Sequence, residues 1–198
     1  MTLELATPHG PARVHLDLPA QAPGALVLGH GAGGGVAAPD LTAAARAATS
    51  LGWSVVLVEQ PYRVAGRRSP APAAQLDAAW TAVVDRLRQH ELAGLPLVAG
   101  GRSSGARVAC RTSAATGVVG VLCLAFPLQP PGRPNAPSRQ PELAAVRVPV
   151  LVVQGDRDPF GLPKRGRGRK VVVVPGDHSL RSAGAATADA VRVWLRGL

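Results

Sequence analysis

Residues 101–105 read G-R-S-S-G, a G-x-S-x-G motif that lies between an apolar run and a segment of small residues. A serine at the tip of a sharp strand-to-helix turn exposes its hydroxyl above the sheet, where it can act as a nucleophile. The residues two before and two after that serine must be nearly free of side chains, because they crowd together. Ser103 has glycine at both places, whereas Ser104 would have Arg102 and Ala106. Ser103 is therefore the candidate nucleophile, although a flexible Gly/Ser turn would give the same short motif.

A nucleophilic serine needs a base, and histidine is the usual one. His178 follows the apolar run Val171–Val174, downstream of the serine, in a P-G-D-H-S loop. In the order typical of hydrolases, the acid and the histidine follow the serine. We therefore expect His178 to be the base, even though a loop histidine taken alone can be purely structural. His30 also lies at a strand end but upstream, and His9, His15 and His90 fall in a hairpin or at a helix end.

The acid that orients the histidine should come from another strand end. The loop after Val148–Gln154 holds two carboxylates, Asp156 and Asp158. Asp158 is better placed, since Asp156 adjoins the strand and can pair with Arg157 or cap the turn. Both could instead be turn formers, because Asp-Pro is a common turn signal. Asp158 is the acid that we predict.

Backbone N–H groups should stabilise the oxyanion of an acyl-transfer reaction. One donor would be Ser104, the residue after the nucleophile. The other would lie in the glycine-rich turn that follows the strand Ala25–Leu28, where Ala32 comes after His30-Gly31. Such a turn could also hold a phosphate, but neither a P-loop lysine nor a helix-opening G-x-G-x-x-G is present.

Alternating apolar and amphipathic segments must position these residues. The apolar, β-branched runs predict strands, and the segment Ala73–His90 carries Leu76, Trp80 and Leu87 at helical spacing. Parallel strands with intervening helices indicate an α/β fold whose chemistry lies at the carboxyl ends of the strands. The expected strands are 2–6, 12–18, 25–28, 54–58, 95–99, 118–125, 148–154 and 170–174, and the expected helices are 40–51 with Asp40 as N-cap, 73–90, 105–115 and 185–195. The stretches 61–72 and 127–141 are rich in proline and are expected to be loops.

Length and composition favour one globular domain over residues 1–198. Hydrophobic residues make up 46% of the chain and charged residues 17%, which argues against disorder. No signal peptide and no membrane-spanning run is apparent, so we expect a cytoplasmic protein without membrane contact. Cys110 and Cys123 fall in a predicted helix and a predicted strand, where buried, reduced thiols are the simplest interpretation.

A formal net charge of +10 raises the question of an acidic partner. The charge is spread along the chain except in Lys164–Lys170, where five of seven residues are basic. Such a run could bind nucleic acid or another polyanion. No aromatic residue interleaves with it to stack on bases, and a solvated loop is the simpler interpretation.

Taken together, these segments resemble the α/β-hydrolase superfamily, in particular its small branch without a cap domain. That branch includes dienelactone-hydrolase-like proteins and the KANL/Tex-type hydrolase-like domains. The resemblance runs from Ala25 to the C-terminus and rests on these motifs: L-G-H-G-A-G-G at 28–34, E-Q-P-Y-R at 59–63, G-G-R-S-S-G-A-R at 100–107, P-L-Q-P-P-G at 127–132, Q-G-D-R-D-P-F-G at 154–161 and G-D-H-S-L at 176–180. It implies an α/β-hydrolase fold, a mostly parallel sheet with helices on both faces and no cap, with Ser103, Asp158 and His178 as nucleophile, acid and base. The segment Leu162–Lys170 is short for the helix that usually joins the last two strands.

The sequence thus predicts a serine hydrolase that cleaves an ester, thioester or similar small acyl compound without metal or organic cofactor. In the absence of a cap, loops must build the substrate pocket, and Tyr62, Arg63 and Arg67 are candidates for polar contact with substrate. Arginine suits a substrate carboxylate or phosphate, although these side chains could equally face water. Two alternatives stay open: a non-catalytic interaction protein that kept the hydrolase fold, and a polyanion-binding protein that uses the basic run. The sequence does not fix the oligomeric state.

Overall fold

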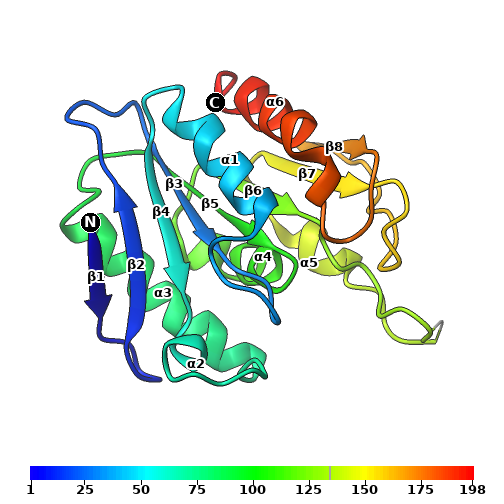
Figure 1. Cartoon of the computed structure of the whole chain (residues 1–198), viewed down its shortest axis with the longest axis horizontal. Helices are drawn as coiled ribbons and strands as arrows, with labels where there is room; N and C mark the ends of the chain where they lie inside the picture. Colours follow the sequence, from blue (N-terminus) through cyan, green and yellow to red (C-terminus); the bar gives the residue numbers. More distant parts are fainter. Residues whose placement is uncertain (134) are drawn as a thin grey trace.

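Within the residues that the computed structural model describes, 1–133 and 135–198, eight strands form one sheet in the order β1-β2-β4-β3-β5-β6-β7-β8 (Figure 1). Pro134, in the predicted proline-rich stretch, lies outside the described residues. Strands β3 to β8 run parallel to one another, whereas β2 pairs antiparallel with both β4 and the edge strand β1. The strands are β1 (Thr2–Leu5), β2 (Ala12–Asp17), β3 (Ala25–Gly29), β4 (Ser54–Glu59), β5 (Leu97–Arg102), β6 (Gly120–Leu124), β7 (Val150–Gly155) and β8 (Arg169–Val174).

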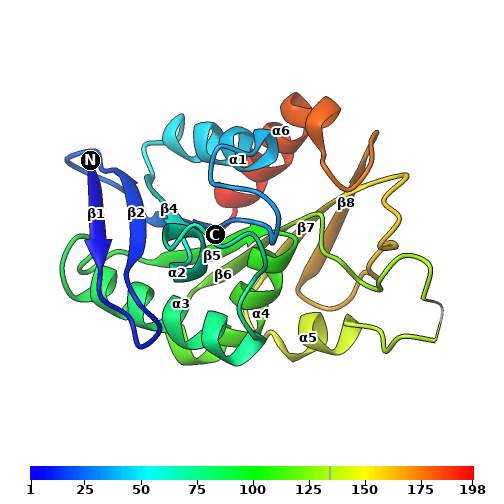
Figure 2. The same ribbon diagram turned by 60° about the horizontal axis from the view of Figure 1, so that its bottom comes forward.

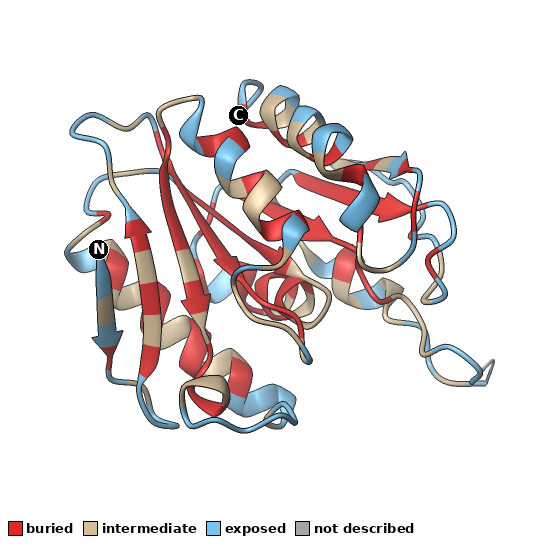
Figure 3. Ribbon diagram, in the orientation of Figure 1, coloured by how far each residue is buried: buried red, intermediate tan, exposed pale blue. Residues whose placement is uncertain are grey.

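Burial follows the place of each strand in the sheet (Figure 3). Every residue of β3, β6 and β7 is buried, as expected for parallel strands that are covered on both faces. The strand β2, which lies next to the edge strand β1, instead alternates between buried and more exposed residues. A continuous apolar run therefore marks a strand that is covered on both faces, and an alternating run marks a strand that is partly exposed on one face. Both kinds of run were predicted correctly as strands.

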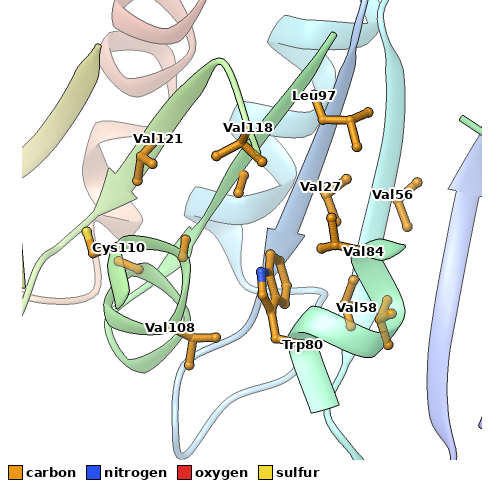
Figure 4. Close-up of a cluster of buried hydrophobic side chains, with 14 of the residues drawn as sticks. Val27, Val56, Val58, Trp80, Val84, Leu97, Val108, Cys110, Val118 and Val121 are labelled. Atoms are coloured by element: carbon orange, nitrogen blue, oxygen red, sulfur yellow. The ribbon is translucent and has the colours of Figure 1, made fainter. Parts of the chain in front are cut away.

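Helices cover both faces of the sheet, as Figures 1 and 2 show. Helices α1 and α6 pack against one face, while α3, α4 and α5 lie on the other. Trp80 of α3 is fully buried in the second of these layers, among valines of β3, β4 and α3 (Figure 4). The predicted α/β-hydrolase fold is confirmed. The helices are α1 (Pro39–Thr49), α2 (Pro61–Val64), α3 (Ala73–Gln89), α4 (Ser104–Thr116), α5 (Gln140–Ala145) and α6 (Gly184–Leu195).

Three local predictions were wrong. Helix α1 begins at Pro39, so Asp40 is not its N-cap but a fully buried residue of its first turn. The predicted loop 61–72 opens with the single helical turn α2, and α5 lies at the end of the second proline-rich stretch. Proline near the start of each of these helices explains the errors, because its fixed φ and missing N–H suit a first helical position as well as a loop.

The two cysteines are free and buried, with their sulfur atoms 3.5 Å apart between α4 and β6. The hydrogen bond with the Cys110 thiol, together with burial, raises the pKa of Cys123 well above its ordinary value. Both side chains therefore pack as apolar groups of the core. Among the described residues, no helix combines the length and the apolar character needed to cross a bilayer.

Candidate active site

The G-x-S-x-G motif forms the turn between β5 and α4. Ser103 has φ 52° and ψ −106°, a left-handed conformation that costs a non-glycine residue energy and recurs at active sites. Its backbone N–H donates to the carbonyl of Leu124 at the end of β6, 2.9 Å away. A Cβ at either Gly101 or Gly105 would collide with the carbonyl oxygen of Gly29. The two glycines are therefore required by close backbone packing around the turn.

The structure brings Ser103, His178 and Asp158 into one hydrogen-bonded chain, called the triad below. The Ser103 Oγ lies 2.9 Å from His178 Nε2, and His178 Nδ1 lies 2.8 Å from Asp158 Oδ2. Since a carboxylate only accepts, Nδ1 carries the proton and donates it to Asp158. The lone pair on Nε2 then accepts the hydroxyl proton of Ser103. This tautomer allows the imidazole to take that proton when the serine attacks an acyl carbon.

Asp158 is held from three sides. Its side chain is only 1% exposed, and Gln154 Nε2 donates to the same Oδ2 that bonds the histidine, at 2.8 Å. The backbone N–H of Phe160 donates to Oδ1 at 2.9 Å. Asp156, two residues earlier, is exposed and accepts a hydrogen bond from the backbone of Gly176. The two carboxylates of this loop thus have separate roles in the geometry, and only Asp158 contacts the histidine.

Short-range contacts hold the loop after β8 that carries His178, which we call the histidine loop. The ring of Phe160 packs against that of His178 with centroids 4.2 Å apart. On the loop itself, Asp177 Oδ1 accepts hydrogen bonds from the backbone N–H and the hydroxyl of Ser179. Those bonds lower the pKa of Asp177, which therefore stays ionised as the cap of this turn. The imidazole is oriented by packing as well as by its two hydrogen bonds.

The glycine-rich turn after β3 is organised around His30, which is 3% exposed. Its Nε2 accepts a hydrogen bond from the backbone N–H of Gln60, so its Nδ1 is the protonated nitrogen and donates to the carbonyl of Gly31 at 2.8 Å. Burial lowers the pKa of His30 below its ordinary value, which keeps the ring neutral. His30 is thus a fixed link between the turns that follow β3 and β4.

Both predicted oxyanion donors are at strand ends beside Ser103. Ser104 is the first residue of α4, and Ala32 follows Gly31, a Cβ on which would lie 3.7 Å from the Cβ of Ser103. Among residues 1–133 and 135–198, neither the Ala32 nor the Ser104 backbone N–H donates a hydrogen bond. Two uncommitted donors near the serine are what an oxyanion requires.

The residues predicted to contact substrate differ in environment. Tyr62 is buried, and its hydroxyl donates to the carbonyl of Ala32, 3.0 Å away. Its phenol therefore supports the glycine-rich turn, while Arg63 beside it is half-buried. Arg67 is exposed and lines a small cavity of about 80 Å³ together with Tyr62, His9 and Gln75.

A second hollow lies beside Phe160, whose ring packs against that of His178. It has a volume of about 380 Å³ and is lined by residues 128–133 of the proline-rich stretch and by residues 159–161 after β7. Phe160 thus contributes both to the wall of this hollow and to the packing of the histidine ring. The connection after β6 holds only the six-residue helix α5 in its described part, which is too short for a cap domain.

The basic run Lys164–Lys170 is mostly exposed and leads into β8. It therefore lies at the amino end of that strand, whereas His178 follows the carboxyl end. Within the described part of the chain, no member of this run forms an ion pair with an acidic side chain. The run is separate from the triad, and its role stays a prediction. Likewise within the described part, no three His, Cys, Asp or Glu side chains are grouped as metal ligands.

Three contacting side chains were not among the predicted site residues. Gln154, buried at the end of β7, bonds Asp158 and the backbone of Phe126 on both sides of its amide. Phe160 packs on the histidine, and Arg102 bonds its backbone carbonyl. A glutamine that ends an otherwise apolar strand was a visible signal for the first. The other two depend on how loops from distant strands meet.

Comparisons with known proteins identify the fold and the family of the chain. Residues 22–193 match the model of an alpha/beta hydrolase domain family. A solved alpha-beta serine hydrolase homologue from Coxiella burnetii is 17% identical with a TM-score of 0.79, covering 98% of this chain and 97% of its own. A serine hydrolase without a lid from Xanthomonas campestris is 25% identical with a TM-score of 0.77, covering 98% and 94%.

A dienelactone hydrolase from Anabaena variabilis is also similar, with 16% identity, a TM-score of 0.77 and coverage of 100% of this chain and 96% of that chain. No curated protein sequence shows significant similarity to the chain. The family match covers well over half of the sequence, and the predicted resemblance is confirmed. The chain belongs to the alpha/beta hydrolase domain family.

Proposed function

We propose that this α/β hydrolase is a serine hydrolase that cleaves a small ester, thioester or similar acyl compound. The observation that carries the proposal is the hydrogen-bonded chain from Ser103 Oγ through His178 to Asp158. A hydroxyl bonded to the free nitrogen of a carboxylate-oriented imidazole is an activated nucleophile. The lidless serine hydrolase and dienelactone hydrolase among its structural neighbours support the same reaction class.

The reaction follows from the positions of the groups. Ser103 Oγ attacks the acyl carbon while its proton moves to His178 Nε2, and Asp158 stabilises the resulting imidazolium. The N–H groups of Ala32 and Ser104 bind the oxyanion of the tetrahedral intermediate. His178 then protonates the departing alcohol or thiol, which leaves an acyl-serine. A water molecule, deprotonated by His178, attacks that ester and releases the acid and free Ser103.

We expect the substrate to approach from the solvent side, because loops border the triad. We propose that the hollow beside Phe160 receives one arm of the substrate and that Arg63 contacts a polar group on the other. The Tyr62 hydroxyl already donates a hydrogen bond to the carbonyl of Ala32, so the contribution of Tyr62 would be to hold the glycine-rich turn in place. In Arg63→Ala, short acyl substrates with an anionic group should lose their advantage, while a neutral activated ester is hydrolysed nearly as before. Equal loss on both substrates would contradict a substrate contact.

Labelling with a fluorophosphonate tests the proposal directly. We expect one covalent adduct, mapped by mass spectrometry to Ser103, together with hydrolysis of p-nitrophenyl acetate. Ser103→Ala should abolish both, whereas Ser50→Ala, which alters an exposed serine after α1, should change neither. A folded protein without an adduct would favour the non-catalytic alternative. Salt-sensitive binding of DNA by the unlabelled protein would favour a polyanion partner instead.

A further inference from the structure

Arg102, the residue directly before the candidate nucleophile, contacts three segments that border the triad. Its Nε lies 2.9 Å from the carboxylate of Asp40 in the first turn of α1. Its Nη2 donates to the backbone carbonyl of His178, 3.1 Å away. A Cβ added to Gly31 would lie 2.9 Å from Nη1, so the guanidinium also lies against the glycine-rich turn. One side chain therefore contacts α1, the glycine-rich turn and the histidine loop.

Asp40 anchors this guanidinium. The Asp40 side chain is fully buried, and the Arg102 side chain is 18% exposed. Burial raises the pKa of Asp40, while the charge of Arg102 opposes that rise. The pair is an ion contact and not a well-aligned hydrogen bond, because Asp40 Oδ2 accepts none within the described residues. A buried carboxylate without its cation would be costly, so the two residues depend on each other.

The bond to His178 joins two distant parts of the sequence. His178 follows the last strand, β8, and is separated from Arg102 by 76 positions. Its imidazole must reach Ser103, which is covalently next to Arg102. The guanidinium thus fixes the backbone of the base relative to the backbone of the nucleophile. A side chain at position 31 of the glycine-rich turn would require the guanidinium to shift.

We infer that Arg102 is a positioning residue. It holds the histidine loop and the glycine-rich turn at the distance from Ser103 that the proposed reaction requires. The inference rests on the proposed function and extends it to a residue that touches neither the substrate nor the reacting atoms. A lysine would not substitute, because its ammonium is a single point of charge, whereas the guanidinium presents three nitrogens in one rigid plane. A shift of about 1 Å between reacting groups is enough to lower a rate about 100-fold.

The test separates positioning from stability with three variants. Arg102→Met leaves Asp40 uncompensated and should lower stability. The double variant Arg102→Met/Asp40→Asn removes the stranded charge and should recover most of that stability in urea unfolding. Arg102→Lys keeps a cation beside Asp40. We expect the double variant and Arg102→Lys to be folded, yet labelled at Ser103 by fluorophosphonate about 10- to 100-fold more slowly, with kcat reduced and KM nearly unchanged.

The matched control is Arg111→Met/Asp77→Asn, which removes a two-pronged ion pair between α4 and α3. This pair contacts none of the site loops, so the control should lose stability but keep its labelling rate. If the double variant at 102 and 40 is labelled within about twofold of the wild-type rate, the positioning role is overturned. A purely structural ion pair would make both double variants behave alike.

Proton NMR keeps this inference separate from the proposed function. The His178 Nδ1–H···Asp158 bond should give a downfield resonance in wild type that is absent in His178→Asn. We expect this resonance to broaden or move upfield in Arg102→Met/Asp40→Asn and to persist in the control. If wild type is not labelled at all, the proposed hydrolase function fails, and the resonance still decides. An unchanged resonance would overturn the positioning role.

Discussion

His30 and His178 lie at the same edge of the sheet, yet their surroundings differ. His30 follows β3 and is buried, and both of its ring nitrogens bond backbone groups of Gly31 and Gln60. His178 follows β8 and remains 18% exposed, and its nitrogens bond the side chains of Asp158 and Ser103. One imidazole joins two turns, and the other joins a serine hydroxyl to a carboxylate. Both histidines follow a strand, so their position does not distinguish them. The hydrogen-bond partners of the ring nitrogens do distinguish a structural histidine from a candidate catalytic one.

The largest expected effect is the loss of the proposed base. His178→Ala should lower kcat/KM on p-nitrophenyl acetate by about 10⁴-fold or more, because nothing else can take the serine proton. The midpoint of urea unfolding should change little, since the ring is partly exposed. His90→Ala, at the exposed end of α3, is the control and should retain full activity. Comparable activity in the two variants would contradict the assignment of His178.

The two carboxylates of the acid loop should separate almost as strongly. Asp158→Asn keeps the shape of the side chain but removes the charge that stabilises the imidazolium, and should reduce kcat about 10³- to 10⁴-fold. Asp156→Asn keeps the oxygen that accepts from Gly176, so its activity should stay near wild type. Steady-state kinetics of the two variants side by side is the measurement. The reverse order would mean that the acid is Asp156.

The other histidine should affect stability more than chemistry. His30→Ala strands the Gln60 N–H and the Gly31 carbonyl and opens a cavity, so the free energy of unfolding should fall by about 2–4 kcal/mol. Urea denaturation of this variant and of His178→Ala gives the comparison. Activity of His30→Ala should also fall, but by less than in His178→Ala, because the proposed proton acceptor is intact. An unchanged free energy of unfolding in His30→Ala would mean that His30 does not hold the two turns together.

The smallest effect is a pH dependence. Burial lowers the pKa of His30 in the folded chain below its ordinary value of 6.5. Between the folded and unfolded pKa values, the unfolded chain binds more protons, so acid favours unfolding. The stability contributed by neutral His30 is complete above pH 6.5 and is lost as the pH falls through the folded pKa. The difference in unfolding free energy between wild type and His30→Ala should therefore shrink in urea titrations below pH 6.5, and a constant difference would show that His30 does not titrate.

The sequence predicted those features that depend on neighbouring residues. The glycines on both sides of Ser103 predicted a crowded turn, and the continuous apolar runs predicted buried strands. Since parallel strands end at one edge, the loops carrying His178 and Asp158 could be expected to meet Ser103. The structure places the Asp158 carboxylate 2.8 Å and the Ser103 hydroxyl 2.9 Å from the two ring nitrogens of His178. Their catalytic roles still await the labelling experiment.

Features that depend on distant packing could not be predicted in this way. Asp40 has the composition of an N-cap, but its carboxylate turns inward because Arg102, 62 positions later, supplies a countercharge. The helix α5 is tied by Glu142 to Arg107 of α4, and nothing in its proline-rich sequence indicates that partner. Ion pairs between residues far apart in the sequence form only when the helices and the sheet pack together. They therefore leave no pattern in the local sequence.

The order of the strands has a consequence for how the protein acquires its site. Ser103 follows β5 near the middle of the chain, but His178 follows β8, the last strand to emerge and the outermost on its side of the sheet. No partly folded species that lacks a docked β8 can pair the two residues. Contacts of such long sequence separation form late and slowly in folding. Reaction of Ser103 with a fluorophosphonate during refolding would therefore act as a clock for the final docking step, which spectroscopic signals from the early helices would miss.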